Sequence, residues 1–152
     1  MQLTINQCKL GIRNAEWRYI LIELYKRFHD EIICHALEDD TIECCGVLAG
    51  SVGSFKKLYR MTNVENSAYR FSWDSKELIS VWNDMEDNNW DHRAVYHSHT
   101  HSEAYPSSTD IRLAAWPEAF YIIVSLLDKQ NPDVRAFTIS GAKVEEVSIK
   151  II

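Results

Sequence analysis

Two histidines separated by a single residue are the first feature of this sequence that could bind a metal ion. If residues 93–99 form a strand, as their apolar run indicates, His97 and His99 leave the same face about 7 Å apart. Two imidazoles at this spacing can reach one ion at about 2.0–2.1 Å per ligand. Asp110 adds an oxygen ligand if the polar loop at 100–106 turns back over the strand end. Such a set leaves one coordination position open for water, as in catalytic zinc sites.

Each of these residues also has a simpler interpretation. Ser107 and Asp110 are spaced as in a capping box, where Asp110 would only satisfy backbone N–H groups at a helix start. His101 continues the alternation and could replace Asp110 as the third ligand, although its polar loop favours a solvent-facing ring. Glu43 could be an exposed carboxylate at the start of a strand. Spacing alone therefore leaves the ligand set open.

Length and composition limit the class of protein. The chain has 152 residues, of which 46% are hydrophobic and 25% charged, as is typical of one soluble globular domain. With 16 Lys and Arg against 22 Asp and Glu, the net charge of −6 argues against sequence-independent nucleic-acid binding. No stretch is long and apolar enough to span a membrane, and the first residues lack a signal-peptide pattern. We therefore expect a cytoplasmic protein that binds neither nucleic acid nor membrane.

The cysteines do not indicate a metal site or a disulfide scaffold. Cys8, Cys34, Cys44 and Cys45 have neither CxxC spacing nor the density of a disulfide-rich domain. Adjacent cysteines on a strand point to opposite faces, so Cys44 and Cys45 are expected to be reduced core side chains.

Apolar periodicity and turn residues predict a mixture of strands and helices. Strands are expected at residues 19–23, 43–50, 55–61, 93–99, 120–127, 134–140 and 144–152. Helices are expected at residues 24–38, 75–85 and 108–116. Because the elements do not alternate strictly, we predict an α+β fold with a mixed, largely antiparallel sheet. Two main helices would flank it, and a short helix would follow the loop after His99.

The chemistry-bearing residues together form a known pattern. Glu43, His97-Ser98-His99, Ser107 and Asp110 reproduce the signature E…H-[ST]-H-x7-S-x2-D. The sequence therefore resembles the JAMM (MPN-plus) metallopeptidase family, especially its compact prokaryotic members. The resemblance begins at about Tyr19, so we divide the chain into an N-terminal extension at 1–17 and a JAMM/MPN-like domain at 18–152.

The resemblance implies a role for each matching residue. His97, His99 and Asp110 match the ligands of one zinc ion, whose fourth ligand would be water. Glu43 matches the general acid and base, and Ser107 matches the residue whose hydroxyl stabilises the oxyanion. Ser98 has no direct catalytic role in the family. Thr100 stands where the family often has proline, which puts the rigidity of that loop in doubt.

The family also implies a substrate class. We expect a zinc-dependent hydrolase that cleaves a peptide or isopeptide bond at the C-terminal tail of a ubiquitin-like or sulfur-carrier protein. An edge strand near the metal could bind such a tail by strand addition, and residues 63–73 and 84–92 could form the rim of the site. One alternative is a non-catalytic MPN-type binding scaffold. Another is a mononuclear iron oxygenase, which uses the same ligand set but belongs to all-β folds.

Overall fold

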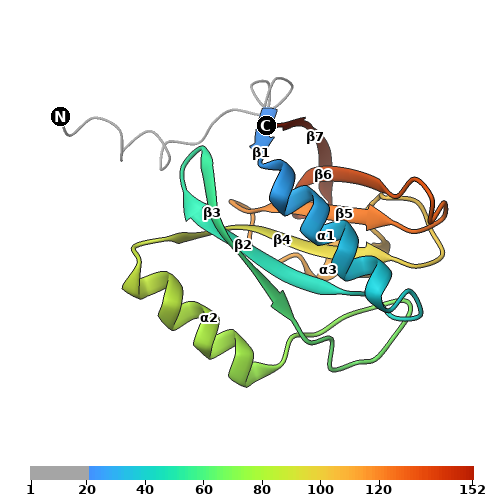
Figure 1. The fold of residues 1–152 in the computed structure, drawn as a ribbon, viewed down its shortest axis with the longest axis horizontal. Coiled ribbons are helices and arrows are strands. Elements are labelled where there is room, and N and C mark those ends of the chain that lie inside the picture. Colours follow the sequence, from blue (N-terminus) through green and yellow to red (C-terminus); the bar gives the residue numbers. More distant parts are fainter. Residues whose placement is uncertain (1–20) are drawn as a thin grey trace.

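A computed structural model describes residues 21–152 of the chain (Figure 1). The expected extension at 1–17 and the first two residues of the first expected strand lie outside the described residues. The described elements are β1 (Leu21–Leu24), α1 (Lys26–Glu38), β2 (Cys45–Ser51), β3 (Ser54–Met61), α2 (Ser75–Asp87), β4 (Asp91–His99), α3 (Ser108–Leu113), β5 (Phe120–Ser125), β6 (Asp133–Ser140) and β7 (Lys143–Ile151).

The strands form one mixed sheet. Its order is β1-β7-β6-β5-β4-β2-β3, so β4 lies in the interior and β1 and β3 form the edges. The β1–β7 and β4–β5 pairs are parallel, and the other four neighbouring pairs are antiparallel. This topology confirms the predicted α+β class and the mixed, largely antiparallel sheet.

The helices cover both faces of the sheet (Figure 1). On one face α1 buries Phe28, Ile32 and Ala36 against the core side chains of the central strands. On the other face lie α2, which buries Val81 and Met85, and the short α3. None of the helices within residues 21–152 combines the length and apolar character needed to cross a membrane.

Strand β4 delivers the two histidines to the α2 and α3 face. Residues 94–99 are all buried, and the period of two puts Val95, His97 and His99 on the same side of the sheet. Cys45 belongs to the core on this side, whereas Cys44 belongs to the core under α1. The prediction that both cysteines are core residues on opposite faces is confirmed.

Several element boundaries differ from the expectation by a few residues, and for two of them the physical reason is clear. Leu24 was expected in the first helix, but it is the last residue of β1, where it pairs with Ile151 and is fully buried. The strand expected from residue 43 begins at Cys45. The third helix ends at Leu113 rather than near Trp116, because the chain extends there and the Trp116 ring stacks on Trp73, with 5.3 Å between ring centroids.

Candidate metal centre

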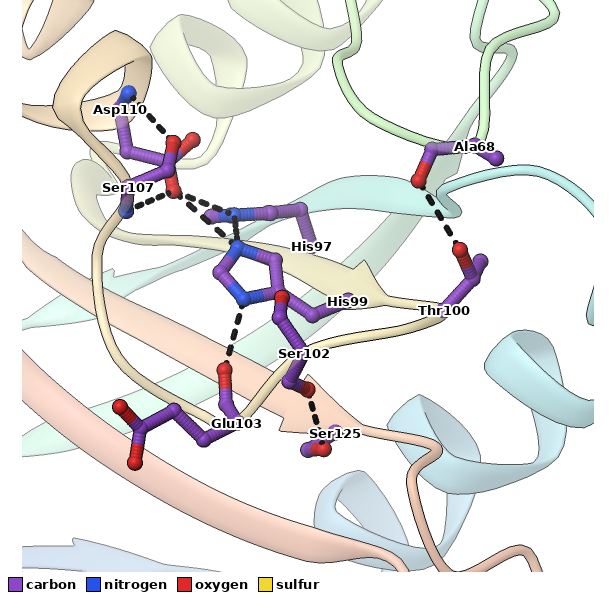
Figure 2. A network of polar contacts seen from close by, with 9 residues as sticks. All are labelled: Ala68, His97, His99, Thr100, Ser102, Glu103, Ser107, Asp110 and Ser125. Atoms are coloured by element: carbon purple, nitrogen blue, oxygen red, sulfur yellow. Dashed lines mark hydrogen bonds and ion pairs between the residues drawn. The ribbon is translucent and has the colours of Figure 1, made fainter.

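The structure brings His97, His99 and Asp110 together at the end of β4 (Figure 2). The Nε2 atoms of the histidines are 3.0 Å apart, and Asp110 Oδ2 lies 3.3 Å from His97 Nε2 and 3.1 Å from His99 Nε2. In a tetrahedral zinc site with bonds of 2.0–2.1 Å, neighbouring ligand atoms are about 3.3 Å apart. The three donor atoms therefore fit around one divalent metal ion.

The imidazole of His99 is oriented by a backbone carbonyl. Its Nδ1 donates to the Glu103 carbonyl oxygen at 2.8 Å, since a carbonyl oxygen can only accept, and this bond orients the ring so that Nε2 faces the cluster (Figure 2). Burial opposes the charged form of His99, but the hydrogen bonds with Asp110 and Glu103 outweigh it and raise its pKa. Metal-binding histidines typically donate the N–H of the ring nitrogen that does not face the metal to a carbonyl or carboxylate oxygen, as His99 does here.

Asp110 is an ionised carboxylate in a largely buried place. Burial opposes its charge, but hydrogen bonds with His97 and His99 hold its pKa well below the usual range for aspartate. A carboxylate that stays ionised and faces two imidazoles can act as the oxygen ligand of a metal ion.

Ser107 and Asp110 also form the capping box of α3. The Asp110 N–H donates to Ser107 Oγ at 3.1 Å, and the Ser107 N–H donates to Asp110 Oδ2 at 2.7 Å. The same Oδ2 faces both histidines, so the capping interpretation is confirmed and is compatible with the ligand interpretation. Because Ser107 Oγ acts as an acceptor in the cap, its O–H remains available to donate a hydrogen bond.

Glu43 lies beside this centre at the end of the neighbouring strand. Cys45 pairs with His97, and the Ser98 N–H donates to the Cys44 carbonyl at 3.0 Å, so the same register places Glu43 opposite His99. Glu43 is only 4% exposed, and its Oε2 has no hydrogen-bond partner within the described part of the chain. Burial raises the pKa of Glu43 to about 8, and His99 opposes this shift. The alternative considered from the sequence, that Glu43 is an exposed carboxylate, is therefore wrong.

The side chain of Ser98, for which the family resemblance implies no direct catalytic role, has a structural role. Its Oγ accepts a hydrogen bond of 2.8 Å from the Cys44 N–H, which ties β4 between the two histidines to the residue after Glu43. A small hydroxyl residue at this position therefore fixes the separation between Glu43 and the histidines.

His101, the alternative ligand, does not join the cluster. It is exposed, its Nδ1 lies 2.6 Å from Thr100 Oγ, and its ring stacks on Tyr69. Thr100, at the position where the family often has proline, is buried and donates to the Ala68 carbonyl at 2.9 Å (Figure 2). The threonine thus anchors the metal-side loop to the segment around Ala68 by a hydrogen bond.

A cavity of about 230 Å³ opens next to His97 and Asp110. Its remaining walls are mainly apolar and come from the segment before α2 and from α3 and the residues after it; they include Phe71, Trp73, Leu113, Trp116 and Tyr121. Of the expected rim segment at 63–73, residues 70–73 line this cavity. The segment at 84–92 does not line this cavity: His92 packs among Trp73, Trp82 and Trp116 behind it.

Comparisons with known proteins agree with this geometry. Residues 26–140 match the family described as prokaryotic homologs of the JAB domain. The chain therefore belongs to the prokaryotic branch of the JAB/MPN family, which confirms the resemblance noted from the motif. The fold is not the all-β fold on which the oxygenase alternative depends.

Individual relatives are similar over most of the chain. A CysO-cysteine peptidase of Mycobacterium tuberculosis is 40% identical over 123 residues, which cover 80% of this chain and 84% of the relative. A desampylase of Haloferax volcanii is 32% identical over 131 residues, which cover 80% of this chain and 90% of the relative.

Two solved structures show the same architecture. The solution structure of a Desulfitobacterium hafniense protein has a TM-score of 0.77 and 32% identity, covering 86% of this chain and 92% of the other. The crystal structure of a JAB1/MPN domain protein from Archaeoglobus fulgidus has a TM-score of 0.55 at 16% identity, covering 85% and 96%, which shows a common fold.

Proposed function

We propose that the protein is a zinc-dependent hydrolase that cleaves a peptide or isopeptide bond at the C-terminal tail of a ubiquitin-like or sulfur-carrier protein. The observation that carries this proposal is the convergence of two imidazoles and an ionised carboxylate beside a buried glutamate. Two nitrogen donors and one oxygen donor suit zinc and leave a coordination position for water. The two named relatives, a CysO-cysteine peptidase and a desampylase, support a hydrolase and this class of substrate.

The roles of the surrounding residues follow from their chemistry. When bound by His97, His99 and Asp110, zinc supplies the Lewis acidity that makes a water molecule nucleophilic near neutral pH. Glu43, whose Oε2 has no other partner in residues 21–152, takes the proton of the attacking water and later delivers it to the leaving amine. The Ser107 hydroxyl, whose hydrogen is not used in the helix cap, donates a hydrogen bond to the oxyanion of the tetrahedral intermediate.

The surroundings of the site suit an extended tail without large side chains at the scissile bond. The sheet edges are β1 and β3, so the interior strand β4 offers no free edge beside its histidines. The extended residues 70–73 lie closer, because they line the cavity that His97 and Asp110 also line. The Phe71 N–H and carbonyl make no backbone hydrogen bond within the described residues, so they are available to pair with a substrate backbone.

Incubation of the zinc-loaded protein with carrier conjugates tests the proposal. The conjugates are a carrier ending in Gly-Gly joined to cysteine by a peptide bond, and the same carrier joined to a lysine side chain. We expect mass spectrometry to detect free carrier, with turnover about 10²- to 10⁴-fold lower for Glu43→Gln, since that is the usual contribution of a general acid or base.

The outcomes of this assay are distinct. Release by the wild type together with zinc retention and little release by Glu43→Gln supports the proposal. Intact conjugates after long incubation with zinc-loaded wild type would contradict it and favour the scaffold alternative. Undiminished turnover by Glu43→Gln would contradict the role of Glu43.

A further inference from the structure

Asn63 is a buried side chain that makes four hydrogen bonds close to the site. It is 5% exposed and lies between the end of β3 and α2. Its Nδ2 donates to the carbonyl oxygens of Glu43 and Arg70, both at 3.0 Å. Its Oδ1 accepts from the N–H groups of Glu65 at 3.1 Å and Ser72 at 3.2 Å. The amide thus uses both of its donor hydrogens and both acceptor positions.

These bonds connect two parts of the site that the chain separates by many residues. One partner is the backbone of Glu43, the residue whose carboxylate is buried beside the histidines. The others include Arg70 and Ser72, which belong to the wall of the cavity next to His97. The Glu43 N–H donates a further hydrogen bond of 2.8 Å to the Ser67 carbonyl, so both the N–H and the carbonyl of Glu43 are held.

No other side chain can make the same set of bonds. Aspartate has the shape of asparagine but no donor hydrogens when ionised, so it would place a carboxylate oxygen against the carbonyls of Glu43 and Arg70. Glutamine has the donors but is one methylene longer, and buried positions rarely accept the extra volume. All four hydrogen bonds therefore require an amide group that is one methylene away from the backbone, as in asparagine.

We infer that Asn63 is a positioning residue that holds Glu43 and the cavity wall at 70–73 in one fixed arrangement. A substrate seated against this wall then meets the Glu43 carboxylate at the correct distance, and a displacement of about 1 Å is enough to reduce catalysis strongly. Asn63 contacts neither the histidines nor Asp110 in any hydrogen bond of the described residues, so it acts through Glu43 and the wall. The inference rests on the hydrolase function proposed above.

The first test compares the same substitution at two asparagines of one segment. Asn63→Asp removes the donors, whereas Asn66→Asp makes the identical change at an exposed residue whose side chain has no hydrogen bond within residues 21–152. We expect kcat to fall about 10- to 100-fold for Asn63→Asp, since a misplacement of about 1 Å away from the reacting atoms can cost about 100-fold in rate. Both variants should retain zinc, and Asn66→Asp should keep the wild-type kcat.

A double-mutant cycle separates positioning from a general loss of stability. If Asn63 acts through Glu43, Asn63→Asp should lower the residual kcat of Glu43→Gln by less than about 3-fold. The assay is run at a temperature where circular dichroism shows all variants folded. If the two substitutions multiply their separate effects, the inference is wrong. Should Asn63→Asp fail to fold, Asn63→Ser, which loses the same paired donors at smaller electrostatic cost, takes its place.

Hydrogen exchange provides a readout that does not depend on activity. In the zinc-loaded protein the Glu43 amide, which donates to Ser67, should exchange at least about 10-fold faster in the Asn63 variant than in Asn66→Asp. Equal protection in the two variants would overturn the inference. If the wild type cleaves no conjugate, the proposed function fails on its own, and the exchange measurement still decides whether Asn63 holds Glu43.

Discussion

Glu43 is a buried carboxylate whose Oε2 has no hydrogen-bond partner among residues 21–152. Such a group costs stability, because no donor in the described part of the chain compensates the buried oxygen. Groups with a pKa shifted by burial cluster at functional sites, where the shift matches a task in proton transfer. The proposed role of Glu43 in proton transfer would therefore explain why a carboxylate is buried at this position.

The raised pKa of Glu43 makes the stability of the metal-free protein depend on pH. The group titrates at about 8 in the folded protein and at about 4.3 in an unfolded chain. Between these values the folded state binds more protons, so the unfolding free energy falls as pH rises. We expect metal-free Glu43→Gln to be more stable than metal-free wild type at pH 8.5, by roughly 1–3 kcal/mol.

Urea unfolding at pH 4 and pH 8.5 measures this difference. Near pH 4 the two proteins should have similar unfolding free energies, since Glu43 is protonated in both states. Glu86→Gln removes an exposed glutamate of α2 and serves as the control, with no pH-dependent gain expected. If the wild type were as stable as Glu43→Gln at pH 8.5, this result would contradict the conclusion that Glu43 is buried and that its Oε2 has no partner within residues 21–152.

His97, on β4, and His101, in the loop after it, should differ sharply in their effect on the metal. His97 is buried with its Nε2 in the cluster, whereas His101 is exposed and lies outside it. We expect His97→Ala to weaken zinc binding by more than about 100-fold, because loss of a ligand exceeds the 10- to 100-fold cost of losing an outer partner. His101→Ala should bind zinc like the wild type. Competition with a chromophoric chelator gives both affinities, and equal losses would reopen the choice of ligands.

At the scale of elements, the start of α3 serves the helix and the site together. Ser107 caps the helix, and the same cap holds the Asp110 oxygen that faces the histidines. We expect Ser107→Ala to lower kcat about 10²- to 10³-fold through the lost oxyanion donor, and to lower stability by about 1 kcal/mol through the lost cap.

Neighbouring substitutions separate these two effects of Ser107. Ser107→Thr keeps the hydroxyl and should retain most of the activity, while Ser108→Ala changes an exposed neighbour and should alter neither quantity. Steady-state kinetics and thermal unfolding of the three variants provide the measurements. Wild-type kcat in Ser107→Ala would exclude an oxyanion role.

Element boundaries that depend on local sequence could be predicted, and those that depend on distant contacts could not. The cap at Asp74 and the apolar stripe of Val81 and Met85 define α2 from the sequence alone. Leu24 fits a helical stripe equally well, and only its pairing with β7 assigns it to a strand. The end of α3 depends on Trp116 stacking on a ring more than 40 residues earlier, which no local pattern shows.

At the scale of the molecule, the sheet topology brings together residues from three separate parts of the sequence. The antiparallel β2–β4 pair sets Glu43 against His99, and the connection between the parallel strands β4 and β5 places α3 over the histidines. The motif, together with the family that it resembles, indicates Glu43, His97, His99, Ser107 and Asp110 as candidates. It could not indicate Asn63 or the aromatic cavity, because their partners are fixed only by the folded chain.

Zinc K-edge X-ray absorption of the zinc-loaded protein tests the proposed metal centre directly. We expect one zinc per chain with two imidazole nitrogens and two oxygens, at about 2.0–2.2 Å. The oxygens would come from Asp110 and a water. A sulfur ligand at about 2.3 Å, which would implicate a cysteine, or a third imidazole, which would implicate His101, would contradict it.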